Sequence, residues 1–207
     1  MRIKLALRTL VIASLGACAA GNAPSPQEPE ATPAPTTLAR AARPAAGDSL
    51  VGVLDQPAPP WQVAQWFNSP PLALEQLRGK VVLVRWFMDP SCPFCSATAP
   101  VLRTLHERYG ARGLAVIGMY HHKQETPLDP AQVAGWVKHY GYQFPVAIDK
   151  DWTTLRRWWL DGHERSYTSV SFLIDKAGIV RRVHLGGTIN DDDARAISAD
   201  VERLLAQ

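Results

Sequence analysis

The chain has 207 residues, of which 46% are hydrophobic, so it is long enough to form a domain with a sizeable apolar core. Its net charge is +3, and three cations within the first eight residues account for that excess. The remaining 19 basic residues are balanced by 19 acidic ones, so charge gives no support for a nucleic acid as partner.

Residues 1–17 have the features of a secretory signal peptide. A basic start is followed by the apolar run 9–17, which is too short to span a bilayer. The run leads into "LGAC" (15–18), which resembles the bacterial lipobox whose cysteine receives a lipid. An ordinary secretory signal with an unrelated cysteine is the alternative. We expect Cys18 to be lipidated, which would anchor the mature chain to a membrane on the periplasmic side of a bacterial cell envelope.

The segment 18–46 is rich in proline and alanine and has no periodic apolar pattern. Such a composition buries too little surface to offset the entropy of ordering, so it predicts an extended, disordered tether. The folded domain is therefore expected over residues 47–207.

Strands and helices alternate in the rest of the chain. Runs of β-branched and aromatic residues predict strands buried on both faces, and apolar residues at helical spacing predict helices. Asp129 and Pro130 mark a helix start. This order predicts an α/β fold with a mixed central sheet, helices on both faces, and a C-terminal hairpin and helix. The predicted strands are 80–87, 113–120 and 144–149, the helices are 97–110, 129–141, 151–162 and 191–206, and the hairpin is 170–185.

Cys92 and Cys95 lie between the first predicted strand and helix, at the sheet edge where α/β proteins place their chemistry. Two cysteines two residues apart can exchange with a disulfide, because the second resolves the mixed disulfide that the first one forms. Cys92 would cap the helix and Pro93 would be its first residue, a position that lowers a thiol pKa. We therefore assign Cys92 as nucleophile and Cys95 as resolving cysteine. An inert structural disulfide is the alternative, whereas structural zinc would need more ligands.

The order of these elements around the cysteine pair resembles the thioredoxin fold. The chain is similar to the TlpA/ResA-type redoxins, which are membrane-tethered thiol–disulfide oxidoreductases. That resemblance implies a reductase of specific protein disulfides, without organic cofactor, that receives electrons from a membrane-bound donor; we expect a monomer. It covers about residues 57–204, and its motifs are "LALEQLRGKVVLVRWF" (72–87), "SCPFC" (91–95), "GLAVIGMY" (113–120) and "SFLIDKAGIV" (171–180).

The same resemblance implies that a substrate docks on Pro93 and Phe94 and on the loop that ends at Thr168 and Ser169. The family places a cis-proline where Ser169 stands. A cis bond before serine costs roughly 3 kcal/mol, so we expect a trans bond here and altered docking.

Two further departures from the family concern Arg85 and Thr98. Arg85 occupies a place where relatives often have Asp or Asn. Its side chain either points toward the sulfurs, where it would favour a thiolate, or extends outward to solvent. Thr98 stands where many relatives have a glutamate, so a proton-transfer role cannot be assigned there.

Two other functions compete with the redox assignment. Cys92 and Cys95 could hold copper or zinc together with His121, His122 or the more distant His184, as in a metal chaperone. The preceding "FMDPSC" (87–92) also resembles a peroxiredoxin loop, but such peroxidases have Thr or Ser three residues before the reactive cysteine, where this chain has aspartate.

The tryptophans at positions 152, 158 and 159 follow helical spacing. They could form an aromatic patch that faces a substrate, but this spacing is more typical of core residues. We therefore predict that they pack in the core.

Overall fold

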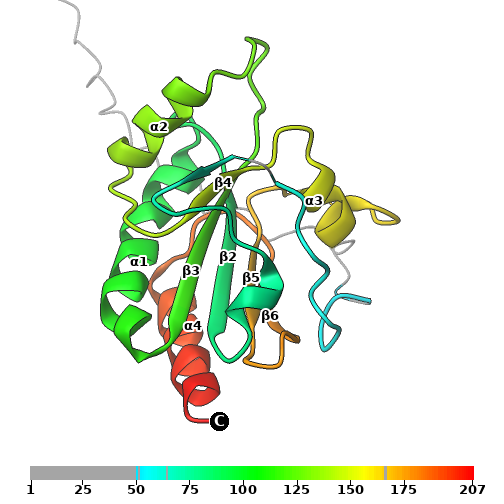
Figure 1. Ribbon diagram of the computed structural model, residues 1–207, viewed down its shortest axis with the longest axis vertical. Helices are drawn as coiled ribbons and strands as arrows, with labels where there is room; N and C mark the ends of the chain where they lie inside the picture. Colours follow the sequence, from blue (N-terminus) through cyan, green and yellow to red (C-terminus); the bar gives the residue numbers. More distant parts are fainter. Residues whose placement is uncertain (1–49, 51, 64, 166) are drawn as a thin grey trace, which may run out of the picture. The chain divides into compact units, whose positions relative to one another are not determined.

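The computed structural model describes residues 50–207 except 51, 64 and 166 (Figure 1). The predicted signal peptide, Cys18 and the predicted tether lie outside the described residues. Within the described part of the chain, no helix is both long enough and apolar enough to cross a membrane.

The described residues form a six-stranded mixed sheet in the order β1-β4-β3-β2-β5-β6. The central strands β2, β3 and β4 are parallel, and β1, β5 and β6 each pair antiparallel to a neighbour. This arrangement confirms the predicted mixed sheet with its C-terminal hairpin. The strands are β1 (Trp66–Phe67), β2 (Val81–Phe87), β3 (Leu114–Tyr120), β4 (Val146–Ile148), β5 (Ser171–Ile174) and β6 (Val180–His184).

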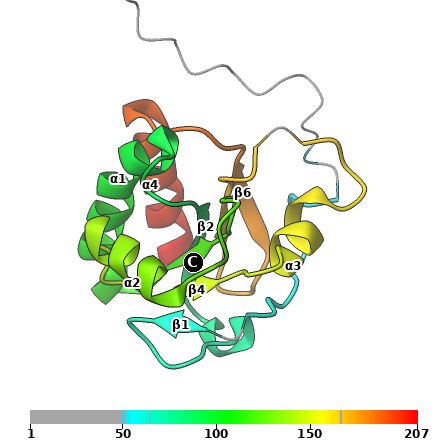
Figure 2. The same ribbon diagram turned by 90° about the horizontal axis from the view of Figure 1, so that it is seen from above.

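Strand β2 lies in the middle of the sheet, and all seven of its residues are buried. Alternate side chains point to opposite faces. Leu83 and Phe87 join an apolar cluster with helices on one face, and Val84 and Trp86 join a second cluster on the other. Helices therefore cover both faces, as predicted, with α1, α2 and α4 on one side and α3 on the other (Figure 2).

Local sequence rules determine where the helices begin. The Asp129 side chain accepts a hydrogen bond from the Ala131 N–H at 2.9 Å and caps α2 as predicted. Asn190 caps α4, whose first turn holds the predicted acidic run. Helix α1 continues through Pro100 and ends before Gly110. The helices are α1 (Pro93–Tyr109), α2 (Pro130–His139), α3 (Thr153–Leu155) and α4 (Asp191–Leu205).

The predicted helix 151–162 is confirmed over residues 153–160, although not as one regular α-helix. The buried Asp149 carboxylate accepts the Thr154 and Leu155 N–H groups at 3.0 and 2.7 Å, and α3 then widens into the π-helical turn η3 (Arg156–Leu160). Asp149 fixes this start from five and six residues upstream, a longer spacing than that of an ordinary N-cap, so the rules for helix starts do not reveal it. Three short elements were also missed, β1 and the 3-10 helices η1 (Leu74–Leu77) and η2 (Gly110–Arg112), because a few residues make no periodic pattern.

The two tryptophans of η3 pack in the core. Trp158 and Trp159 are buried, and each meets Phe172 edge-on at ring-centroid distances of 5.3 and 5.9 Å. The core prediction is confirmed for both. Trp152 is half-buried and packs edge-on against His121.

Candidate active site

The two cysteines occupy the start of α1 with unequal access to solvent. Cys92 is the N-cap, and its Sγ accepts the Cys95 N–H at 3.2 Å, with Pro93 as the first helical residue. This confirms the predicted capping arrangement. Cys92 is 7% exposed and Cys95 1%, and neither forms a disulfide. Cys92 is thus the sulfur that a partner reaches more easily.

Hydrogen-bond donors converge on the Cys95 sulfur. The Cys92 thiol, the Ser169 hydroxyl at 3.5 Å and the Met88 N–H at 3.4 Å all contact it. Against the opposing effect of burial, the Cys92 thiol first and then these donors lower the pKa of Cys95 to about 6. The hydrogen bond to Cys95 in turn raises the pKa of Cys92. The sequence predicts a lowered pKa for Cys92, whereas the donors that converge on the Cys95 sulfur favour a thiolate at Cys95.

The loop before β5 lies against the sulfurs. No peptide bond among the described residues is cis, which confirms the trans bond expected before Ser169. The Thr168 hydroxyl pairs with His121 Nε2 at 2.9 Å. On the other side of the pair Pro93 is exposed, and Phe94 is 36% exposed. Phe94 therefore presents an apolar ring close to Cys92 in the chain, and the serine loop lies against Cys95.

The structure does not assemble the alternative metal site of Cys92, Cys95, His121 and His122. His122 is bound to the Tyr120 hydroxyl at 2.9 Å and to the Thr126 carbonyl at 2.6 Å. Over residues 50–207, apart from the three left out, no three His, Cys, Asp or Glu side chains are grouped so that they could hold a metal ion. In this structure the hydrogen bonds of His121 and His122 therefore direct the two rings to different partners, and the described residues give this alternative no support.

His184 also lies apart from the sulfurs. Its Nε2 is 3.4 Å from the carboxylate of Asp193 at the start of α4. This contact turns the side chain toward α4, so His184 does not complete a metal site with the cysteines.

Arg85 points inward. It is 1% exposed, and it donates to Ser171 Oγ at 3.2 Å and to the Gly187 carbonyl at 2.8 Å. The outward orientation left open by the sequence is excluded. Thr98, in the place of the family's glutamate, is buried and accepts the Ile189 N–H at 3.1 Å, which is a structural role.

Sequence reasoning missed two groups, one at the Cys95 sulfur and one at Arg85. The Met88 N–H is a backbone donor and leaves no side-chain signal. Ser171 lies opposite Arg85 in the β2–β5 pairing, so a correct strand register would have identified it.

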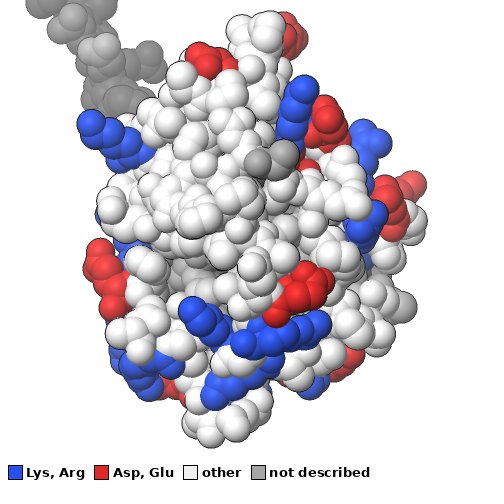
Figure 3. All heavy atoms as spheres, viewed as in Figure 1, with Lys and Arg blue, Asp and Glu red and all other residues white. Residues whose placement is uncertain are grey.

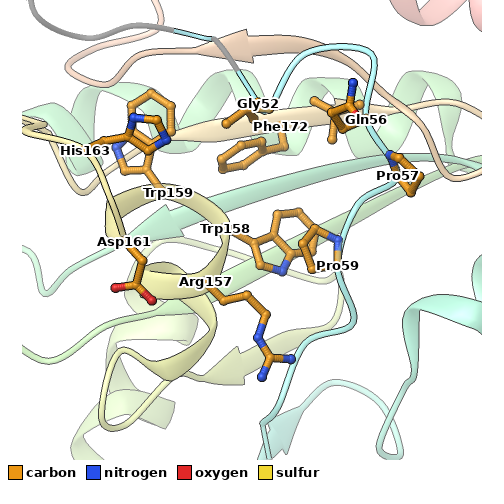
Figure 4. Close-up of a pocket in the computed structure, with 12 residues that line it drawn as sticks. Gly52, Gln56, Pro57, Pro59, Arg157, Trp158, Trp159, Asp161, His163 and Phe172 are labelled. Atoms are coloured by element: carbon orange, nitrogen blue, oxygen red, sulfur yellow. The ribbon is translucent and has the colours of Figure 1, made fainter.

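A separate cavity of about 190 Å³ lies on the face of the sheet covered by η3 (Figure 4). Trp158, Trp159 and Phe172 line it together with Arg157 and His163. It contains neither cysteine and so forms no part of the dithiol site. In the face shown in Figure 3, Lys and Arg gather most densely at the lower end near the C-terminus, whereas the charged groups of the upper part lie around an uncharged central area.

The fold and the dithiol together define a thioredoxin-fold protein suited to thiol–disulfide exchange. A model of the AhpC/TSA family matches residues 54–183, and the chain belongs to this family. The predicted membership in the thioredoxin-like redoxins is thereby confirmed.

Named relatives and solved structures agree with this family. The chain is 33% identical over 127 residues to protein DipZ of Mycobacterium bovis, a match that covers 60% of the chain and 17% of DipZ. It is 28% identical over 116 residues to the thiol-disulfide oxidoreductase ResA of Halalkalibacterium halodurans, covering 56% of the chain and 60% of ResA. Each match thus spans less than two thirds of the relative. A crystal structure of a thioredoxin-like superfamily protein superimposes with a TM-score of 0.62 at 27% identity, over 73% of this chain and 97% of the other.

Proposed function

We propose that the protein is a thiol–disulfide oxidoreductase that reduces specific protein disulfides through Cys92 and Cys95. The observation that best supports this proposal is that the two cysteines differ in their exposure and in their hydrogen-bond donors. Cys92 caps α1 at the more accessible position, whereas Cys95 is enclosed by hydrogen-bond donors that stabilise a thiolate. The similarity to ResA, a thiol-disulfide oxidoreductase by name, supports it.

The reaction follows from this arrangement in two exchanges. Cys92 attacks a substrate disulfide and gives its proton to the Cys95 thiolate; a Cys92–substrate disulfide forms and the substrate S–S bond breaks. The departing substrate thiolate takes the proton from Cys95. The Cys95 thiolate then attacks the Cys92 sulfur, forms the Cys92–Cys95 disulfide and releases the second substrate thiolate. Two electrons pass from the pair to the substrate.

The surface beside Cys92 supports docking of a polypeptide. Phe94 presents an apolar ring next to the nucleophile, and Pro93 is exposed beside it. The substrate chain would lie between this ring and the loop at Thr168 and Ser169, whose hydroxyls are already engaged by His121 and Cys95.

The proposal includes a location in the bacterial cell envelope, with a lipid on Cys18 and a membrane-bound electron donor that restores the dithiol. The lipobox-like "LGAC" (15–18) supports the anchor. Cys18→Ser tests it separately from the chemistry: this variant should leave the membrane fraction and keep its disulfide reductase activity. A variant that stays membrane-bound would contradict the lipid anchor.

Insulin reduction under dithiothreitol turnover tests the activity. We expect the wild type to accelerate precipitation of the insulin B chain and Cys92→Ser to abolish this. When reduced Cys95→Ser is mixed with insulin after dithiothreitol has been removed, it should accumulate a mixed disulfide with the substrate, because the resolving thiol is absent. Ser96→Ala is the control, since the Ser96 hydroxyl donates to the Pro90 carbonyl and not to a sulfur. Full activity in Cys92→Ser, or rapid peroxide consumption without insulin reduction, would refute the proposal.

A further inference from the structure

Arg85 is a charged side chain buried in the central strand of the sheet. It is 1% exposed, and a buried charge is costly unless a partner compensates it. Arginine keeps its proton in proteins, so a guanidinium in this place remains a cation at neutral pH even though desolvation lowers the pKa of Arg85. Some neighbouring group must therefore compensate the charge of this cation.

Neutral groups provide its hydrogen bonds. Nη1 donates to Ser171 Oγ and Nη2 to the Gly187 carbonyl, whereas Nε has no hydrogen-bond partner among the described residues. In the same part of the chain no Asp or Glu lies within ion-pair distance of Arg85. Its positive charge thus has no carboxylate as counter-ion.

The sulfurs lie on the side to which Arg85 points. Leu83 and Phe87 flank it on the same face of β2 and belong to the apolar cluster that contains both cysteines. Met88, which donates its N–H to Cys95, follows three residues later on the same segment. The cysteines are accordingly among the groups that interact electrostatically with Arg85.

Among the described residues, no other ionisable group that interacts with Arg85 supplies a negative charge at neutral pH. Burial raises the pKa of Tyr142, so its phenol stays neutral. Burial also lowers the pKa values of His121 and His184, and His184 is paired with Asp193. The titratable groups that interact with Arg85 are Cys95, Tyr142 and Cys92, with His121 and His184.

We propose that Arg85 is the internal counter-ion of the thiolate in the reduced Cys92–Cys95 pair, and that it is a positioning residue that shifts the redox equilibrium toward the reduced form. The thiolate exists only in the reduced protein, and the disulfide is neutral. A cation beside the pair therefore stabilises the reduced state selectively and makes the pair a weaker reductant.

This inference deepens the proposed function and names its substrate class. A pair with a stabilised reduced form gives electrons only to disulfides that are reduced more easily still. Strained or exposed disulfides have such potentials, whereas structural disulfides of secreted proteins resist reduction. The substrates are thus labile disulfides in partner proteins.

Arg85→Gln is the main test, because glutamine retains hydrogen-bonding capacity without the charge. Arg85→Met is a second variant, since replacing a buried charge by an apolar side chain is often tolerated. The matched control is Arg103→Met, which removes a hydrogen bond from an α1 arginine to the Tyr140 carbonyl at 2.7 Å. For each reduced protein, the equilibrium with glutathione at pH 7 and the thiolate absorbance at 240 nm against pH are measured.

We expect Arg85→Gln and Arg85→Met to shift the glutathione equilibrium at least tenfold toward the protein disulfide, a change of about 30 mV. Their thiolate should also form at higher pH than in the wild type, and Arg103→Met should stay within twofold. A glutathione equilibrium constant within twofold of the wild-type value in a folded Arg85 variant would overturn the inference. A wild-type thiolate that forms only above pH 8.5 would overturn it without any variant.

Neither measurement uses a protein substrate. If the wild type fails to reduce insulin while the Arg85 variants shift as expected, the proposed function fails and the inference stands. If the wild type reduces insulin while the Arg85 variants do not shift, the inference is overturned and the proposed function stands.

Discussion

Replacing Ser169 by alanine removes the hydroxyl that lies 3.5 Å from the buried sulfur of Cys95. Ser169 is itself 6% exposed, so water does not readily replace that hydroxyl. The substitution takes one donor from the Cys95 thiolate and leaves the Met88 N–H and the Cys92 thiol in place. The pKa of Cys95, which these groups lower to about 6, should therefore rise.

The size of the rise follows from the strength of a hydrogen bond to a charged group, about 1.5–3 kcal/mol. A contact of 3.5 Å is long, so the lower end applies, and about 1.5 kcal/mol corresponds to about one pKa unit. The pKa of Cys95 is lower than in an unfolded chain, where it is about 8.5. Ionisation therefore stabilises the reduced protein fully above pH 8.5, and this contribution is lost as the pH falls through about 6.

The midpoint potential against pH reports this ionisation. While the reduced pair carries two protons, the potential falls by about 59 mV per pH unit, and by about 30 mV per unit once it carries one. We expect the slope to change near pH 6 in the wild type and about one unit higher in Ser169→Ala. Redox buffers between pH 4.5 and 8.5, with alkylation of the free thiols after acid quenching, give the curve.

Ser96→Ala is the matched control because the Ser96 hydroxyl donates to the Pro90 carbonyl. The pH at which its slope changes should be that of the wild type. A slope of about 59 mV per unit across the whole range would show that no thiolate forms near pH 6. If the slope of Ser169→Ala changed at the same pH as that of the wild type, the Ser169 hydroxyl would not stabilise the thiolate. Either result would refute the reasoning.

Two further predictions concern stability and use urea unfolding at pH 7. Thr98→Val keeps the side-chain shape but leaves the buried Ile189 N–H without its acceptor. We therefore expect the free energy of unfolding to fall by about 1–3 kcal/mol. A fall below about 0.5 kcal/mol, the usual effect of a neutral substitution, would contradict this prediction. Asn190→Ala removes the cap that accepts the Asp193 N–H at 2.9 Å and should cost about 1 kcal/mol, with Asp192→Ala as an exposed control.

Features that depend on neighbouring residues could be predicted from the sequence. The Cys92 cap, with Pro93 after it, follows from the rules for helix starts, and so does the capping of α2 by Asp129. The buried strand β2 follows from its continuous apolar run. Each of these features needs only a few adjacent residues, and each was predicted correctly.

Contacts between distant segments could not be predicted in this way. His121 and His122 are adjacent in the chain, yet the first is bound to Thr168 and the second to Tyr120 and Thr126. Only the folded packing directs them to different partners, and among the described residues the alternative metal site is therefore not assembled.

The cysteine pair itself was determined by the sequence, as were its position at a helix start and the order of its elements. The tertiary structure decided which sulfur the donors surround and where Arg85 points. Ser169 reaches Cys95 across 74 residues of chain, and Ser171 meets Arg85 because β5 pairs with β2 in one register. A helix cap is a local property of the backbone, whereas the charge environment of a buried sulfur depends on which distant segments the sheet brings together.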